Sequence, residues 1–501
     1  MSIYFTNHIE TETYTAEASD TIFANDTASS SSSSSSYLGN LLVVPMDGSH
    51  WVGMKAIAQE MGRRGHRVTV VIPEVSMQMG PGKYYDTVIH PVLYDRAYID
   101  SVTSVHKDMM QKSAQSFIQK IKTRFAVTQK ITDLIYRTAE SLLFNDSLIS
   151  HLAQQGFDAV LTDPMVPTGS LIARKLGIPT INLLRGMPFF LDMRSAGCPC
   201  PPSYVPRFFT GYSDKMSFKE RVVNTLVSLI KLIPLFHIYY HLFPRPLMPN
   251  MVLVGGINCN VRNPLPEDLE SWVSGEFGFV VFTLGTMVSD LPEEKTSIFL
   301  EAFRQIPQKV IWRYTGQVPD NVPENVKMMG WVPQNDLLAH PGARAFITHA
   351  GSHGIFEGLC HAVPMVMMPM RADQHDNAER LANKGAGVVV DIFSITTESL
   401  LQGLNEVLHD VRYKEDVQKL SALHKDRPVE PLDLSVYWTE YVMRHKGAKH
   451  LKPAGIDLNW IQYFCLDVIA LLASVVLLFG ILIVKCMKLC FRKLSRKRKR
   501  D

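Results

Sequence analysis

Two glycine-containing turns in the second half of the chain are suited to binding a phosphate group. The run THAGSHG at residues 348–354 follows a short apolar segment and opens a stretch with helical periodicity. Glycine lets the backbone approach a ligand closely, and the free N–H groups at a helix N-terminus attract anions. A second turn, Leu284-Gly285-Thr286, follows the apolar run Val280–Leu284. Either turn alone would be a weak signal, but two such turns at one cleft predict a site for a phosphorylated ligand.

A histidine and an aspartate in the first half have the residue types of a general base and its partner. His50 follows the apolar run Leu41–Pro45, and Asp163 ends the run Ala159–Thr162. Imidazole can take a proton near neutral pH, and a nearby carboxylate can orient the ring and stabilise its charged form. A lone histidine after a strand is often structural, so this pattern alone leaves both roles open for His50.

Short apolar runs alternate with amphipathic segments from Asn40 onward. Near-continuous apolar strands separated by helices indicate parallel sheets covered on both faces, with ligands at the carboxyl ends of the strands. The pattern predicts an α/β fold with two doubly wound, Rossmann-like domains facing a cleft, and the Pro-rich segment Pro244–Pro249 is the expected hinge. The strands are expected at Leu41–Pro45, Arg67–Ile72, Ala159–Thr162 and Pro179–Leu184 in the first domain, and at Val280–Leu284, Lys309–Tyr314, Val326–Gly330, Arg344–Thr348, Val363–Met368 and Val388–Asp391 in the second.

The C-terminal end has the pattern of a membrane anchor. Residues 466–484 form an apolar span, Trp460 and Tyr463 precede it as an interfacial aromatic belt would, and the basic tail 485–501 follows. The positive-inside rule places this tail in the cytosol and the preceding body on the other side of the membrane. The final KRKRD resembles the dilysine signal that returns membrane proteins to the endoplasmic reticulum, with a stop-transfer cluster as the alternative. The alternative to the span itself is a buried core helix with a basic tail.

Charge and composition exclude one class of function and characterise the N-terminus. The 501-residue chain has a formal net charge of +3, but the tail holds nine Lys or Arg and one acid, so the rest is net negative. Nucleic-acid binding therefore has little support.

Residues 1–39 are polar, with eight serines at 29–36, and lack the apolar segment of a signal peptide, so we expect a disordered leader. The seven cysteines show neither metal-binding spacing nor the pattern of a disulfide framework.

One long run resembles the signature of a known family. The run WVPQNDLLAHPGARAFITHAGSHGIFEGLCHAVPMVMMPMRADQHDN, which begins at Trp331, resembles that of the UDP-glycosyltransferase superfamily in its vertebrate UDP-glucuronosyltransferase form. The similarity extends from Asn40 to the tail and includes VVPMDGSHW, NMVLVGGINC and LHKDRPVEPLDLSVYWTEYVMRHKGA. This resemblance implies the two-domain GT-B fold, in agreement with the strand pattern.

The resemblance implies an enzyme that transfers glucuronate from UDP-glucuronate, a co-substrate, to small lipophilic acceptors at a membrane. It implies inversion and no cofactor, and its acceptors would be phenols, steroids or bilirubin-like molecules. Residues 40–249 would bind the acceptor, 250–445 would bind the UDP-sugar, and 446–465 would lead to the span. Transfer of glucose or galactose would use the same residues. A catalytically poor chain that associates with active relatives, as a homo- or hetero-oligomer, is a further alternative.

The resemblance also implies which residues bind the nucleotide and the sugar. Trp331 would stack on uracil, Gln334 would hold the edge of the base, and Glu357 would accept the ribose hydroxyls. Asp373 and Gln374 would form hydrogen bonds with the sugar hydroxyls. Taken singly, these residues have ordinary structural explanations, such as a core tryptophan or a capping aspartate. Their joint spacing favours the functional one.

The resemblance also implies which residues bind the diphosphate and which remove the acceptor proton. The residues around the two glycine turns would bind the diphosphate and neutralise its charge, so that no metal ion is required. The acceptor hydroxyl would lose its proton to a histidine supported by an aspartate. The diphosphate group comprises Thr286, His349, Gly351 and His353, and the catalytic pair is His50 with Asp163.

Two positions depart from the family pattern in ways that bear on function. Arg371 stands where relatives carry an aromatic or apolar residue, and it either contacts the donor carboxylate or faces solvent. Between about Phe243 and Pro244 the chain is shorter than the pattern by several tens of residues. The lost part resembles the final helix and strand of the first domain, and losing such a strand would expose apolar surface. The acceptor pocket itself is expected from the variable region Ser76–Phe243.

Overall fold

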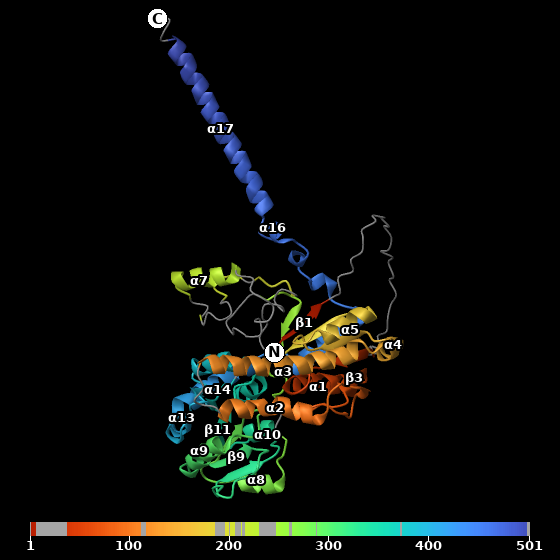
Figure 1. Cartoon of the computed structure of the whole chain (residues 1–501), viewed down its shortest axis with the longest axis vertical. Coiled ribbons are helices and arrows are strands. Elements are labelled where there is room, and N and C mark those ends of the chain that lie inside the picture. Colours follow the sequence, from red (N-terminus) through yellow and green to blue (C-terminus); the bar gives the residue numbers. More distant parts are fainter. Residues whose placement is uncertain are drawn as a thin grey trace.

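The chain forms two α/β domains followed by one long helix that projects away from both of them (Figure 1). Each domain is built on its own sheet, and the predicted fold class is confirmed. The computed structural model describes residues 2–6, 38–111, 117–185, 196–199, 201–205, 212, 216–229, 247–259, 263–286, 288–370 and 373–497.

The first domain is built on a seven-stranded sheet with the order β4-β3-β2-β5-β6-β1-β7. Strands β2 to β6 run parallel to one another, and the apolar runs that predicted β2, β3, β5 and β6 are almost entirely buried. The strands are β1 (Ser2–Thr6), β2 (Asn40–Val44), β3 (Arg67–Pro73), β4 (Asp86–His90), β5 (Ala159–Thr162), β6 (Thr180–Leu184) and β7 (Met251–Leu253). The helices are α1 (Ser49–Arg63), α2 (Arg96–Gln111), α3 (Phe117–Leu143), α4 (Asp146–Gln154), α5 (Thr168–Leu176) and α7 (Phe218–Leu229).

The first residues of the chain form a strand, which corrects the expectation of a leader disordered throughout 1–39. β1 lies between β6 and β7 and pairs with both in antiparallel register, and Ile3 is fully buried. The sequence Ser-Ile-Tyr-Phe-Thr is rich in residues that favour strands, but the polar residues after it dominate the composition of the leader. Pairing on both sides satisfies the backbone groups of β1 and covers the sheet edges that a missing strand would leave open. The predicted shortfall at Phe243 and Pro244 lies outside the described residues.

The second domain is built on a six-stranded, wholly parallel sheet with the order β10-β9-β8-β11-β12-β13. All six strands predicted for it are present, and buried apolar clusters lie on both faces of the sheet. The strands are β8 (Phe279–Thr283), β9 (Lys309–Arg313), β10 (Val326–Met329), β11 (Ala343–Thr348), β12 (Met365–Met367) and β13 (Gly387–Val389). The helices are α8 (Glu267–Val273), α9 (Glu293–Arg304), α10 (Gln334–Leu338), α11 (Ser352–Cys360), α12 (Gln374–Ala382), α13 (Thr397–His409) and α14 (Val411–Lys425).

The chain crosses between the domains twice, so a single boundary at 249/250 does not describe it. β7 lies C-terminal to that boundary but belongs to the first sheet. Helix α15 (Pro431–Arg444) also returns to the first domain, where Val436 and Val442 are fully buried in its core. Arg64, at the end of α1, forms ion pairs with the carboxylates of Asp433 and Glu440 on α15.

The C-terminal helix α17 (Leu466–Lys497) has the length and composition of a membrane span. Its segment Leu466–Leu489 has a mean hydropathy of 2.8, and none of its most apolar window is buried against the protein. The alternative of a buried core helix therefore does not hold. A short helix, α16 (Trp460–Tyr463), precedes it, and Figure 1 shows α17 extending well beyond both domains.

Candidate active site

The turn that carries His50 is held by its neighbours. Gly48 takes a positive φ of 75°, and α1 begins immediately after it. The Asp47 carboxylate accepts hydrogen bonds from the backbone N–H of Gly48 at 2.6 Å and from that of Met77 at 2.6 Å. His50 therefore lies in the first turn of α1, beyond the carboxyl end of β2.

The fold brings His50 and Asp163 into direct contact. Their Nδ1 and Oδ2 atoms are 2.6 Å apart, and the other oxygen of Asp163 accepts a hydrogen bond from the Met165 N–H at 2.9 Å. Asp163 is 2% exposed, whereas His50 is 15% exposed. An ionised carboxylate can only accept, so the imidazole proton sits on Nδ1 and the Nε2 lone pair stays available as a base.

His349 lies between the two glycine turns and explains why both positions are glycine. A Cβ at Gly285 would be 2.5 Å from His349 Cε1, and a Cβ at Gly351 would be 2.4 Å from His349 Nε2. Ala350 has a positive φ of 61°, so the backbone between them is strained. Gly351 caps α11, whose first N–H groups have no acceptor within the helix. The N–H groups at the start of α11, with Thr286 on the neighbouring turn, have the geometry that helix N-termini use to bind anions.

Arg313 supports this site, and sequence reasoning missed it. Its guanidinium donates a hydrogen bond to the carbonyl oxygen of Gly285, and burial lowers the pKa of Arg313. The signal available in the sequence was a charged residue at the carboxyl end of the predicted strand Lys309–Tyr314, where ligands bind in doubly wound sheets.

Trp331, Gln334 and Glu357 lie on adjoining elements of the second domain. The Gln334 side chain donates a hydrogen bond to Glu357 Oε2 at 2.5 Å. Burial raises the pKa of Glu357 to about 7, with a smaller contribution from Asp336, while the hydrogen bond from Gln334 opposes the shift. Trp331 is 71% exposed despite its size, which suits a flat surface for stacking.

Asp373 and Gln374, at the start of α12, are buried and held in defined orientations. Asp373 Oδ2 accepts hydrogen bonds from Ser352 Oγ at 2.7 Å and from Asn377 Nδ2 at 3.1 Å. Gln374 Oε1 accepts one from the Met370 N–H at 2.8 Å. Arg371 lies outside the described residues.

The side chains of Arg185 and His353 connect the two domains at this site. Arg185, directly after β6, places Nη2 at 3.8 Å from Asp373 Oδ1 and donates from Nη1 to Ser49 Oγ. His353, on α11, pairs through Nδ1 with the amide of Asn258. Burial holds the pKa of His353 well below its usual range, and the positive charge of Arg185 adds to this effect. The His50–Asp163 pair of the first domain and the glycine turns of the second therefore face one site, and Arg185 is a member of it that sequence reasoning missed.

A disulfide ties the connection between the domains to α11, which corrects the reading of the cysteines. Cys259 follows β7 and is bonded to Cys360, the last residue of α11, across a sequence separation of 101. His424 on α14 lies beside the sulfur atoms and packs against the ring of Phe356 at 5.3 Å between centroids. One long-range bridge leaves no spacing pattern, so it could not be identified from sequence alone.

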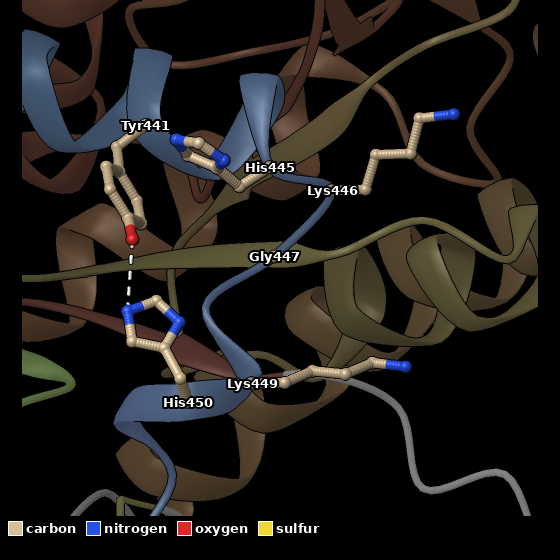
Figure 2. A pocket seen from close by; sticks show the side chains of 6 residues that line it. All are labelled: Tyr441, His445, Lys446, Gly447, Lys449 and His450. Carbon is tan, nitrogen blue, oxygen red and sulfur yellow. Dashed lines mark hydrogen bonds between the residues drawn. The ribbon is translucent and has the colours of Figure 1, made fainter. Parts of the chain in front are cut away.

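A hollow of about 480 Å³ lies away from this site, where α15 ends and the chain leads to the anchor (Figure 2). Tyr441 and His450 are joined across it by a hydrogen bond of 3.0 Å, and Lys446 and Lys449 extend toward one side. It contains none of the residues expected to do chemistry.

The two facing α/β domains, with the glycine turns in one and a His–Asp pair in the other, have the GT-B fold of glycosyltransferases. Solved structures agree with this fold. The glycosyltransferase VinC in complex with DTDP superposes with a TM-score of 0.54 at 18% identity, over 81% of this chain and 100% of that one. Os79 from O. sativa, in complex with U2F and trichothecene, superposes with a TM-score of 0.53 at 16% identity, over 81% and 100%.

The chain belongs to the family described as "UDP-glucoronosyl and UDP-glucosyl transferase", whose model matches residues 39–241 and 230–501. It is 43% identical to human UDP-glucuronosyltransferase 1A6 over 497 residues, which covers 92% of this chain and 93% of that protein. It is 42% identical to human UDP-glucuronosyltransferase 1A1 over 501 residues, which covers 93% and 94%. The predicted family is confirmed, and the two matched segments overlap at residues 230–241.

Proposed function

We propose that this glycosyltransferase transfers glucuronate from UDP-glucuronate to the hydroxyl group of a small lipophilic acceptor, with inversion at the anomeric carbon. The observation that carries the proposal is the 2.6 Å contact between His50 and Asp163 in one domain, opposite the anion site of the other. The names of the curated relatives support glucuronate as the sugar.

In the proposed reaction His50 acts as the general base. Its Nε2 takes the proton of the acceptor hydroxyl as the oxygen attacks the anomeric carbon, and Asp163 stabilises the imidazolium that forms. The bond from the anomeric carbon to the acceptor oxygen forms while the bond to the UDP oxygen breaks. A single displacement converts the α-linked donor into a β-linked product.

The departing UDP carries the charge that the second domain must stabilise. The N–H groups of the first turn of α11, together with His349 and Thr286, would contact the diphosphate. Arg313 would reinforce the site through the Gly285 carbonyl that it holds. These donors neutralise the leaving group without a metal ion, so we expect turnover in the presence of a chelator.

The nucleoside would lie on the exposed face of Trp331, with Gln334 at the edge of the base and Glu357 accepting the ribose hydroxyls. Asp373 and Gln374 would hold the hydroxyl groups of the sugar. Because Gln334 already bonds Glu357, the base and ribose contacts are coupled before the donor arrives.

UDP affinity should depend on pH through Glu357. Burial raises the pKa of this carboxyl to about 7, and hydroxyl groups that donate to the ionised form would lower it again on binding. Binding therefore releases a proton near neutral pH, and the affinity for UDP should fall about tenfold between pH 8 and pH 6. Calorimetry in two buffers of different ionisation enthalpy measures both quantities. The Glu357→Gln variant accounts for the titration of UDP itself, and equal pH slopes in the two proteins would contradict the role of Glu357.

We also propose that the body of the protein faces the lumen of the endoplasmic reticulum, with the tail in the cytosol. The apolar helix α17 and the basic residues that follow it support this orientation. The Cys259–Cys360 disulfide fits an oxidising compartment. The retrieval signal proposed for the final KRKRD extends beyond Lys497 and lies outside the described residues.

Membranes that contain this chain alone test the proposed function. Offered UDP-glucuronate or UDP-glucose with a phenolic acceptor, they should form a β-linked glucuronide, identified by proton coupling at the anomeric carbon and by cleavage with β-glucuronidase. A glucoside as the main product would identify glucose as the sugar. No product from this chain alone, together with altered activity of a co-expressed relative, would instead support the catalytically poor partner.

A further inference from the structure

Arg185 is a charged side chain of the interdomain site that the proposed reaction has not used. It follows β6 at the carboxyl end of the strand, and its side chain is 15% exposed. A buried guanidinium keeps its charge, so it requires an anionic or hydrogen-bonding partner. Its guanidinium lies between Ser49, the neighbour of His50, and Asp373 at the start of α12.

Among the residues that the structure describes, the groups around Arg185 occupy only part of its hydrogen-bonding capacity. The separation of 3.8 Å between Nη2 and Asp373 Oδ1 is an ion pair but is too long for a hydrogen bond. Nη1 donates to the neutral hydroxyl of Ser49. Among the described residues, Asp373 is the only acid within ion-pair distance of Arg185. A guanidinium has five N–H groups arranged for bidentate contact with a carboxylate, and Asp373 does not provide that contact.

We propose that Arg185 binds the carboxylate of the donor sugar and so selects UDP-glucuronate over UDP-glucose. This inference rests on the proposed function, in which Asp373 holds a sugar hydroxyl. In glucuronate the carboxylate is attached to C5, next to the hydroxyl group on C4. If Asp373 Oδ1 accepts that C4 hydroxyl, the sugar carboxylate lies on the side of Arg185. UDP-glucose carries a neutral CH₂OH group there, which cannot form the charged, bidentate contact.

The charges at this site favour an anion beside Arg185. Asp163 is already paired with His50, and Asp373 Oδ2 already accepts two hydrogen bonds. Burial and the charge of Arg185 keep His353 neutral, so it adds no second positive charge that would compete with Arg185 for the sugar carboxylate. Arg185 would thus be shared between Asp373 and the sugar, and the charge of the donor would be balanced at both ends, by Arg185 at the carboxylate and by the glycine turns at the diphosphate.

A structural role for Arg185 makes a different prediction. If the residue only joins Ser49 of the first domain to Asp373 of the second, its loss should weaken the binding of both UDP-sugars by the same factor. If it binds the sugar carboxylate, only the affinity for UDP-glucuronate should fall. The two donors differ in the C5 substituent alone, so the ratio of their affinities separates these roles.

The experiment measures dissociation constants of UDP, UDP-glucose and UDP-glucuronate by calorimetry, using the full-length protein in detergent micelles. Arg185→Ala should raise the dissociation constant of UDP-glucuronate about 100-fold, as expected when one partner of a buried charge pair is removed. Arg185→Lys, which keeps the charge but loses the bidentate geometry, should raise it about tenfold. UDP and UDP-glucose should change by less than about threefold in both variants, as should all three ligands in the control Arg174→Ala, an exposed arginine on α5.

Three outcomes would overturn the inference: an equal loss of affinity for both sugars, no loss for either, or a wild-type protein that binds UDP-glucose as tightly as UDP-glucuronate. The measurement needs no turnover, so it is separable from the proposed function. A wild-type chain that selects UDP-glucuronate through Arg185 but transfers no sugar would support the inference and contradict the reaction. If the wild-type chain transfers glucuronate but Arg185→Ala keeps the same donor selectivity, the proposed reaction would be supported and the role of Arg185 contradicted.

Discussion

Replacing His50 by alanine is expected to lower kcat for sugar transfer by about 10³- to 10⁴-fold while leaving the affinity for UDP unchanged. His50 is the side chain whose Nε2 is free to take the acceptor proton, because its Nδ1 is committed to Asp163 at 2.6 Å. The proposed UDP contacts all belong to the second domain, so we expect UDP to bind this variant with its full enthalpy. Initial rates at saturating donor, with calorimetry on the same preparation, measure both quantities.

Two further variants make the His50 experiment specific. Asp163→Asn keeps the shape of the pair but presents an amide that can donate to Nδ1, which favours the tautomer with the proton on Nε2. This variant should lose nearly as much kcat as His50→Ala, about 10³-fold. His151→Ala removes an exposed histidine on α4 in the same domain and should leave kcat unchanged. Retention of wild-type kcat in His50→Ala would exclude the base mechanism.

The sequence predicted those features of the fold and the site that depend on residues close together in the chain. The strand Ala159–Thr162 was predicted with the bounds that β5 shows, because an apolar run between turn residues has one reasonable interpretation. The placement of His50 and Asp163 at one sheet edge followed from the rule that parallel strands bring their carboxyl ends together. For the donor residues the dense signature between Trp331 and Asn377 was needed, since each of them is ordinary by itself.

Features that depend on long-range contacts could not be predicted. β1 forms because β6 and β7 offer backbone partners on both sides, and nothing within the leader itself indicates them. Arg185 reaches Asp373 across the domain junction, and Cys259 bonds Cys360 at a separation of 101 residues. Helix α15 carries an ordinary amphipathic pattern, which indicates a helix but not the domain on which it packs.

Two long-range contacts meet at α11, the disulfide and the pairing of Asn258 with His353. Gly351 and His353 lie at the N-terminus of this helix, Glu357 is in its middle, and Cys360 is its last residue. In the proposed function, the diphosphate and the ribose would contact the same helix of nine residues. Since Asn258 pairs with His353 and Cys259 is bonded to Cys360, the segment after β7 is fastened to both ends of that helix. The position of α11 relative to the first domain thus depends on this segment.

Removal of the disulfide is accordingly expected to have the largest effect on stability. Cys259→Ser or Cys360→Ser should lower the free energy of unfolding by about 3 kcal/mol, because the bond closes a loop of about 100 residues and so restricts the unfolded chain. The same loss should appear in the wild-type protein after treatment with a dithiol reductant. Denaturant unfolding, followed by the fluorescence of the buried Trp312 and the exposed Trp331 together, measures it.

The matched control for this experiment is Cys465→Ser, since Cys465 is a free, exposed cysteine outside both domains. Its unfolding midpoint should equal that of the wild type, and reductant should lower both midpoints equally. Cys259→Ser, by contrast, should be insensitive to reductant because its bridge is already absent. UDP affinity should also fall in Cys259→Ser, since α11 is then held to the segment after β7 by Asn258 and by packing alone. Wild-type midpoints that coincide with and without the dithiol would show that the bridge does not stabilise the folded protein, and the tether to α11 would then have no measurable role.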